Sequence, residues 1–237
     1  RRKEKMKDFS LTQVADLLPP GEIWVLGLGK FGMLAWKRLE KRFPRASFVL
    51  VEEREEKTRG IQERGSLKIV ARDAIGFLLD ARVPGEVWII PAVPVHAAFR
   101  WLLGRLEPPR AASSIPLPRE IDPRVPNPLR SGEETIYTSF AAFVCPDGCD
   151  EPDEICTYTK KARPGNLYEE LSRLEIPGFR THVLRSLQLA PGVGGYPGRS
   201  LEGLHEEVLK TPGNHLVATS CRCHGVINAL NWRETGA

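Results

Sequence analysis

Five of the 237 residues are cysteines, and they occur in two short stretches of the chain. The stretch CPDGCDEPDEIC holds Cys145, Cys149 and Cys156, and the stretch CRC holds Cys221 and Cys223. An odd number of closely spaced cysteines argues against a disulfide framework and favours metal or redox chemistry. Each stretch follows an apolar run, so we expect two strand ends to bring the two groups together in space.

The spacing of the cysteines bears on the kind of metal centre that they would form. Neither group has the two-residue separation that is typical of a zinc knuckle, whereas iron–sulfur clusters take four thiolates at more varied spacings. We therefore predict that the first three cysteines and one of the last two bind an iron–sulfur cluster. Structural zinc is the first alternative, and metal-free redox thiols or simple buried cysteines are the others. His224 adjoins Cys223, and with five cysteines present we do not count it as a ligand.

A second chemically informative stretch is VLGLGKFG, in which Gly27, Gly29 and Gly32 form the pattern G-x-G-x-x-G. An apolar run precedes it and a helical pattern follows it, which is the setting of a dinucleotide-binding turn. There Gly27 permits the tight turn, Gly29 lets a pyrophosphate approach the backbone, and Gly32 lets the helix pack against the sheet. The N-terminus of the helix offers free N–H groups and a positive dipole end to the phosphates.

The acid expected for such a site is Glu52, which follows the apolar run at residues 47–51. A carboxylate there accepts both ribose hydroxyls of an adenosine, which favours NAD over NADP. His96 follows the fourth apolar run and is a candidate contact, although a solvent-facing histidine at a helix start explains it equally well. The predicted NAD(H) site comprises Gly27, Leu28, Gly29, Lys30, Phe31, Gly32, Glu52 and His96. The alternative is a turn of the same fold that has lost its ligand.

Three segments, VLGLGKFG, FVLVEER and IVARDA, together resemble the nucleotide-binding domain of potassium-uptake regulators and potassium-channel regulatory domains, the TrkA N-terminal family. The resemblance covers about residues 20–105. It implies a Rossmann-type domain that binds NAD(H) or another adenine nucleotide at the glycine turn, at Glu52 and at Asp73. Arg72 stands where that family usually has glycine, which affects the contact implied for Asp73. The C-terminal half has no such resemblance, so no role in potassium transport is implied.

The pattern of the whole chain predicts an α/β protein. Apolar runs at residues 23–26, 47–51, 67–71 and 86–91 alternate with helical patterns, which favours a parallel sheet with right-handed crossovers. Residues 107–130 contain seven prolines and are predicted to be a linker, or an extended arm on the surface, and not part of a structured core. The second half predicts strands at 135–144, 181–189 and 215–219, helices at 166–174, 200–210 and 224–232, and a glycine-rich loop at 191–198. We therefore expect an N-terminal tail or helix (1–19), a Rossmann dinucleotide-binding domain (20–106), a proline-rich linker (107–132) and a second α/β domain with the cysteine-ligated metal centre (133–237).

Charge and composition argue against two classes of protein, nucleic-acid-binding proteins and membrane-spanning proteins. The net charge of +4 is dispersed along the chain, and no aromatic and basic stripe suggests nucleic-acid binding. We expect no membrane span and no signal peptide, and hence a cytoplasmic protein. The predicted function is a redox protein that couples NAD(H) to an iron–sulfur centre, and the sequence leaves open whether it is an NAD-dependent oxidoreductase. The alternatives are a non-enzymatic NAD-sensing or redox-sensing regulator and a zinc-stabilised nucleotide-binding module. A protein partner or a homo-oligomer is expected in either redox role.

Overall fold

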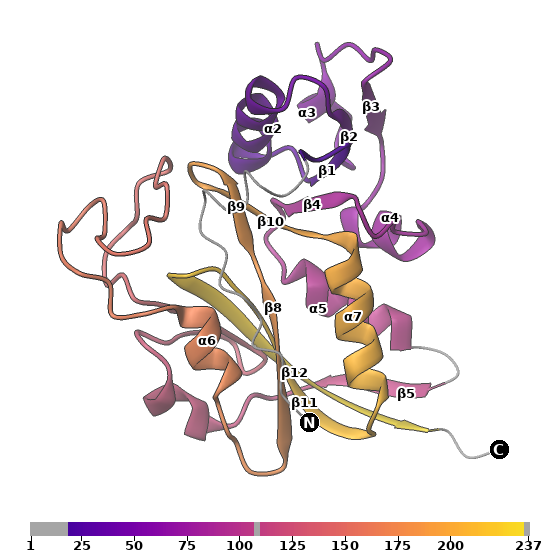
Figure 1. Cartoon of the computed structure of the whole chain (residues 1–237). Coiled ribbons are helices and arrows are strands. Elements are labelled where there is room, and N and C mark those ends of the chain that lie inside the picture. The colour runs from indigo at the N-terminus through magenta and orange to yellow at the C-terminus, as the bar shows by residue number, and fades with distance from the viewer. Residues whose placement is uncertain (1–18, 107–109, 235–237) are drawn as a thin grey trace, which may run out of the picture.

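A computed structural model describes residues 19–106 and 110–234, which form two mixed β-sheets with helices on their faces (Figure 1). The α/β class expected from the sequence is confirmed in this broad form. The tail or helix expected at residues 1–19 falls almost wholly on residues 1–18, which lie outside the described residues. None of the helices in the two described ranges has the length and apolar character that crossing a lipid bilayer requires.

The first sheet carries the glycine turn, and four of its strands run parallel in the order β3-β2-β1-β4. Successive side chains of β1 point to opposite faces of the sheet, and the strand is continuously apolar from Ile23 to Leu26 because both faces are covered. Ile23 and Val25 pack in the cluster that includes α2, whereas Trp24 and Leu26 pack in the cluster that includes α5. The strands are β1 (Glu22–Leu26), β2 (Ser47–Val51), β3 (Leu67–Val70) and β4 (Trp88–Pro91), and the helices are α2 (Lys30–Arg42), α3 (Glu55–Thr58), α4 (Ala74–Asp80) and α5 (Ala97–Leu106).

The second half of the chain completes this first sheet. β10 (Val193–Pro197) pairs antiparallel with β4, and β9 (Leu187–Ala190) pairs antiparallel with β10. Residues 191–198, which the sequence suggests as a glycine-rich loop, are therefore largely strand. Their glycines permit close packing, because a Cβ at Gly195 would lie 2.5 Å from the carbonyl oxygen of Ile89 in β4.

The second sheet has the order β6-β7-β12-β11-β8, and β5 also pairs with β12. Residues 224–232, for which the apolar spacing predicts a helix, form part of β12, so that prediction is wrong. Ile227 and Ala229 face the cluster around α6, and Leu230 and Trp232 face the cluster around α5 and α7. The elements are β6 (Leu129–Ser131), β7 (Thr135–Ser139), β8 (Phe179–Arg185), β11 (Gly213–Ser220), β12 (His224–Glu234), α6 (Leu167–Ser172) and α7 (Gly198–Leu209).

The proline-rich segment contains regular structure from Arg110 onward. It holds β5 (Arg110–Ile115), the 3₁₀ helix η1 (Arg119–Arg124) and β6, and Leu117, Ile121 and Val125 pack in a core cluster. The prediction that it lies outside the structured core is therefore wrong for residues 110–131. Pro116, Pro118, Pro126 and Pro128 lie between these elements, where no hydrogen bond of a sheet is lost.

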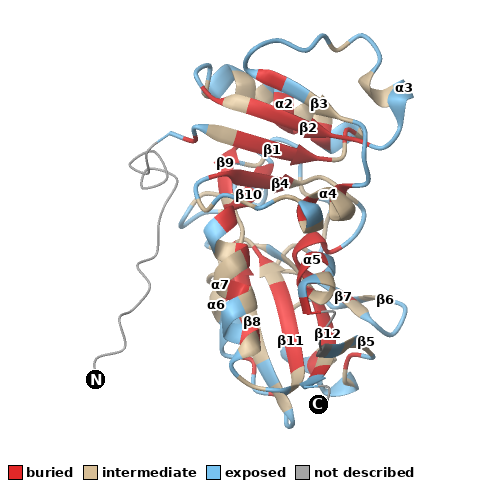
Figure 2. Cartoon of the chain, turned by 90° about the vertical axis from the view of Figure 1, so that its right-hand side faces the viewer, coloured by how far each residue is buried: buried red, intermediate tan, exposed pale blue. Residues whose placement is uncertain are grey.

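A shared core joins the two sheets. α5 and α7 lie between them, and one apolar cluster takes Leu26 and Ile89 from the first sheet and Val217 and Leu230 from the second. Figure 2 shows buried residues along the strands of both sheets and along α5. Because the sheets share this core, groups at their facing ends keep fixed positions relative to one another.

Candidate metal centre beside the glycine turn

All five cysteines line one cavity of about 640 Å³, which we call the cysteine cavity. Three come from the cysteine loop, residues 140–166, and Cys221 and Cys223 come from the turn between β11 and β12. The cysteine loop is the long loop on the left of Figure 1, without helix or named strand, and loops of this length in compact proteins are usually functional or disordered. The structure thus brings the two cysteine groups together. Among the described residues, however, no three His, Cys, Asp or Glu side chains are already arranged to hold a metal ion.

Backbone N–H groups point at three of the five sulfur atoms. The distances are 3.4 Å for Glu151 N to Cys149 Sγ, 3.5 Å for Thr159 N to Cys156 Sγ, and 3.5 and 3.4 Å for Cys223 N and His224 N to Cys221 Sγ. Hydrogen bonds of this kind favour a thiolate over a thiol, and hydrogen bonds to sulfur also tune iron–sulfur clusters. The local backbone of the loop is therefore suited to anionic sulfur.

The pKa values of the thiols show how the cavity acts on charge. Burial raises the pKa of Cys145, and the neighbouring thiolates raise it further. Burial also raises the pKa of Cys223 to about 11 and that of Cys221 well above its ordinary value. The pKa of Cys156 is lowered, chiefly by hydrogen bonds from Thr159. A bound cation would relieve the repulsion between thiolates, so this arrangement favours metal binding over free thiolates.

Arg222 stands between the two cysteines of CRC and ties them to the cysteine loop. Its backbone N donates to Glu151 Oε1 at 2.6 Å, and its Nη2 lies 2.7 Å from Asp153 Oδ1. Its carbonyl oxygen accepts from Leu167 N at 2.9 Å, just after the loop ends. Sequence reasoning missed this residue, and its place between two cysteines is the only signal that could have found it.

The cysteine loop also contacts α2, the helix that follows the glycine turn. Lys30 Nζ lies 2.7 Å from Asp147 Oδ2, and Arg38 Nη1 donates to Asp147 O at 2.7 Å. Phe31 lines the cysteine cavity. Lys30 and Phe31, which the sequence assigns to the nucleotide site, therefore also belong to the surroundings of the cysteines.

The three glycines of the turn differ in what the fold demands of them. Gly27 has φ +84°, and a Cβ there would lie 2.9 Å from Ala92 O. A Cβ at Gly32 would lie 1.9 Å from Gly27 O, so the approach of helix to turn excludes a side chain. At Gly29 the backbone is ordinary, with φ −67°, and the nearest atom to a Cβ would be the flexible Lys57 Nζ at 3.8 Å. Packing therefore explains Gly27 and Gly32 but leaves space over Gly29, where a phosphate approaches in dinucleotide sites.

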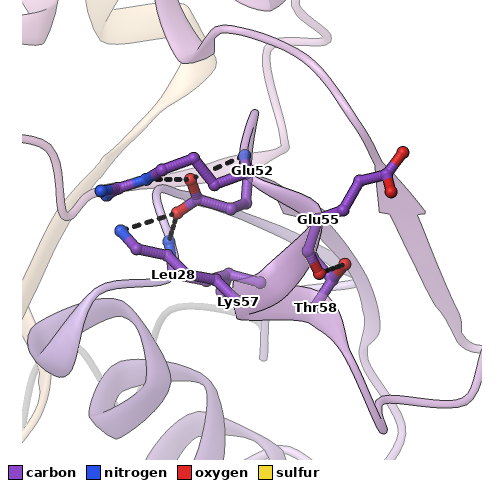
Figure 3. A network of polar contacts seen from close by, with 6 residues as sticks. Leu28, Glu52, Glu55, Lys57 and Thr58 are labelled. Carbon is purple, nitrogen blue, oxygen red and sulfur yellow. Dashed lines mark hydrogen bonds and ion pairs between the residues drawn. The ribbon is translucent and has the colours of Figure 1, made fainter.

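Glu52 follows β2 and its carboxylate reaches the glycine turn (Figure 3). It accepts from Leu28 N at 2.8 Å and from Arg54 N at 3.1 Å, and Lys57 Nζ lies 3.2 Å away. Burial raises the pKa of this carboxyl, but the two amides and the lysine outweigh burial and hold the pKa below its ordinary value. Glu52 is therefore an ionised acceptor at the predicted ribose position, and the Lys57 ammonium lies close both to it and to the space over Gly29.

Asp73 and His96 are engaged within the fold. Asp73 Oδ2 accepts from Gly76 N at 2.6 Å and so caps α4. His96 is buried, with Nδ1 2.9 Å from Asn228 Oδ1 and Nε2 2.8 Å from Thr219 Oγ1. Burial lowers the pKa of His96 to about 4, so the ring is neutral at physiological pH. Both ring nitrogens are within hydrogen-bond distance of other side chains of the protein, and we do not include His96 in the proposed nucleotide site.

Comparisons with known proteins identify relatives of the chain. Residues 98–233 match the AF_1314_C family, described as "Uncharacterized protein, C-terminal domain". An uncharacterized protein of Archaeoglobus fulgidus is 28% identical over 222 residues, which cover 87% of this chain and 97% of that protein. No solved structure matches the chain. These findings correct the resemblance of residues 20–105 to the TrkA N-terminal family, because neither match is to that family. The segments behind the resemblance are those that a strand, glycine turn and helix require in many proteins, so they do not identify a family.

Proposed function

The chain belongs to the AF_1314_C family, and we propose that it is a dinucleotide-binding redox protein with a cysteine-ligated iron–sulfur centre. The observation that carries the proposal is that Lys30, beside Gly29 in the glycine turn, pairs with Asp147 of the cysteine loop, and that the next residue, Phe31, lines the cysteine cavity. When bound, a nicotinamide supplies hydride and an iron–sulfur cluster supplies one-electron transfer. Because a hydride carries two electrons, a flavin or a partner protein is needed to separate them.

Features of the first sheet support NAD(H) at the glycine turn. The parallel order β3-β2-β1-β4 is the order of the first half of a Rossmann-type sheet. Gly29 has open space above it, and α2 directs its free N-terminal amides there. Glu52 would accept the ribose hydroxyls. Lys57, which now contacts Glu52, is long enough to neutralise a phosphate over Gly29.

Features of the cysteine cavity support an iron–sulfur cluster over a single zinc ion. Structural zinc sites are closed, with four ligands at about 2.3 Å or less around one atom. The cavity here, at about 640 Å³, has room for several atoms between the sulfurs. Five thiols are also one more than either centre requires, which leaves one cysteine spare. The amides directed at Cys149, Cys156 and Cys221 would hold the ligand sulfurs in place and stabilise their charge.

A non-enzymatic regulator is the second candidate. The contact of Lys30 with Asp147 favours it, because a phosphate at the start of α2 would compete for the lysine that binds the cysteine loop. Nucleotide binding could then alter the loop and a partner surface without turnover. Val144, which lines the cavity and is 93% exposed, offers apolar area for such a partner or for a second copy of the chain.

Metal and sulfide analysis of protein purified without oxygen tests the proposal. We expect iron and acid-labile sulfide, absorbance near 400 nm that bleaches when NADH reduces the cluster through an added flavin, and loss of most of the iron in Cys149→Ser. Gly29→Val is the matched control, because it should block the nucleotide and leave the metal in place. Reduction of an artificial acceptor by NADH distinguishes the oxidoreductase from the regulator.

Two results would contradict the proposal. If wild-type protein contains no iron and no sulfide, the proposed cluster is contradicted. Zinc found in its place would favour the zinc-stabilised module. If calorimetry detects no binding of NAD, NADP, ATP or AMP, the proposed nucleotide site is contradicted.

A further inference from the structure

Arg163 is a cavity-lining residue with two hydrogen-bond donor atoms that no other described residue uses. Its backbone N donates to Glu154 O at 2.8 Å, and its Nη1 donates to Pro152 O at 2.9 Å, so the side chain is held at the base of the cysteine loop. Its Nε and Nη2 atoms are buried and have no hydrogen-bond partner within residues 19–106 and 110–234. A buried guanidinium remains charged, and leaving its donors unpaired is costly.

The unpaired atoms form the edge of the guanidinium that donates two parallel hydrogen bonds. The bridge between Ile155 and Ala162 places Arg163 beside Cys156, and Cys223 of the other cysteine group lines the same cavity. The nearby arginine of CRC, Arg222, has acidic partners, whereas Arg163 forms no ion pair with an acid in the described residues. Among the groups that line the cavity, the cysteine sulfurs are the acceptors that become anionic when metal binds.

A small anion from solvent is the other conceivable acceptor. Both donor atoms are buried from solvent, however, so a freely exchanging ligand cannot reach them without movement of the loop. The acceptor should instead belong to the interior of the site, and it should carry negative charge. Thiolates that bind metal have this character, whereas the protonated thiols of the metal-free cavity do not.

We propose that Arg163 donates from Nε and Nη2 to sulfur of the metal centre on the side of Cys156 and Cys223, and thereby sets its reduction potential. This inference rests on the proposed iron–sulfur centre. Positive charge and hydrogen bonds at sulfur favour the reduced cluster, which carries one more negative charge, and so raise the potential. Arg163 is a positioning residue, since it acts through the ligand sulfurs and not on a substrate.

Anaerobic redox titration of the metal-loaded protein tests the inference. Arg163→Gln should retain iron and sulfide but shift to lower potential, so that the ratio of oxidised to reduced protein at the wild-type midpoint rises at least tenfold, about 59 mV for one electron. Arg163→Lys keeps the positive charge but loses the edge that donates two parallel hydrogen bonds, so a smaller shift of the reduction potential in the same direction is expected. Lys161→Gln is the matched control, because it removes one exposed charge from the same cavity lining and should change the ratio less than threefold.

Thermal unfolding separates this role from a purely structural one. Metal-free Arg163→Gln should unfold slightly below the wild-type protein, because it loses the hydrogen bond from Nη1 to Pro152 O, whereas the donor edge that it also removes has no partner among the described residues. The metal-loaded variant should lose more stability than the metal-free variant, because the bonds to sulfur are lost in addition. An unchanged potential in a cluster-loaded variant, or equal loss of stability with and without metal, would overturn the inference. If Arg163→Gln cannot retain its cluster, an unchanged potential in Arg163→Lys would also overturn it. Wild-type protein without a cluster would instead overturn the proposed function.

Discussion

Alanine substitutions at the three glycines of the turn should have three different outcomes. The fold requires glycine at Gly27 and Gly32, whereas a ligand is the only reason found for glycine at Gly29. Stability and nucleotide affinity should therefore separate in this series. Gly65→Ala is the control, because a Cβ there would meet no atom within 4 Å.

The contact distances at each glycine determine how much unfolding free energy each alanine variant should lose. In Gly32→Ala the Cβ would lie 1.9 Å from Gly27 O, a backbone atom that cannot turn away, so we expect a loss of about 3 kcal/mol in unfolding free energy. In Gly27→Ala a left-handed φ of +84° costs about 1–2 kcal/mol, and crowding by Ala92 O adds to it. In Gly29→Ala, φ is −67° and no atom lies closer than 3.8 Å, so the change should stay within about 1 kcal/mol.

Nucleotide affinity should follow the opposite order. The Cβ of Gly29→Ala would occupy the space over the turn, so we expect at least about a tenfold weaker affinity for NAD, or about 1.4 kcal/mol. Denaturant titration measures the stability of each variant, and calorimetry measures its affinity. Wild-type affinity in Gly29→Ala would refute the phosphate assignment. Wild-type stability in Gly32→Ala would refute the steric reasoning itself.

Two further predictions concern charge. The pKa of His96 is about 4 in the folded protein against 6.5 ordinarily, so the unfolded chain binds more protons between these values. The contribution of neutral His96 to the unfolding free energy should therefore be fully present above pH 6.5, and the unfolding free energy should fall by up to about 3 kcal/mol as the pH drops toward 4. Denaturant titrations at several pH values should show a smaller loss of stability on acidification in His96→Gln than in the wild-type protein. NAD should bind more tightly than NADP, because Glu52 would repel a 2′-phosphate, and calorimetry with tighter NADP binding would instead assign Arg54 as its receptor.

Local pattern was sufficient to predict much of the first sheet. Its four parallel strands are short apolar runs, and the glycine spacing places a turn between a strand and a helix. The same reasoning failed where pairing between distant segments decides the structure. Residues 224–232 have apolar spacing that suits a helix or a buried strand, and pairing with β11, β7 and β5 selects the strand. β10 joins the first sheet by pairing with β4, and β9 by pairing with β10, and no local pattern encodes either contact.

In the candidate site, too, some residues could be identified from local sequence and others depend on contacts between distant segments. Residue type and spacing identified the cysteines and the glycine turn, because thiolates and missing side chains have distinctive chemistry. Glu52 was identified by its position after a strand, and the structure places its carboxylate at the turn. Arg222 and Arg163 were missed, since the partners of an arginine are not evident in sequence; only the place of Arg222 between two cysteines could have drawn attention to it. His96 was proposed from its position in sequence, which did not indicate that Asn228 and Thr219 would engage both its nitrogens.

The contrast between the two arginines indicates how the cavity behaves without metal. Arg222 already binds Glu151 and Asp153, so the two cysteine groups are joined before any metal arrives. Arg163 has unused donors, so one charge in the cavity still lacks an acceptor. The second sheet depends on neither arginine, because β11 and β12 are held by an apolar core that includes Val217 and Leu230. Loss of metal should therefore loosen the cysteine loop and leave the sheets folded, in contrast to zinc fingers, which unfold without their metal.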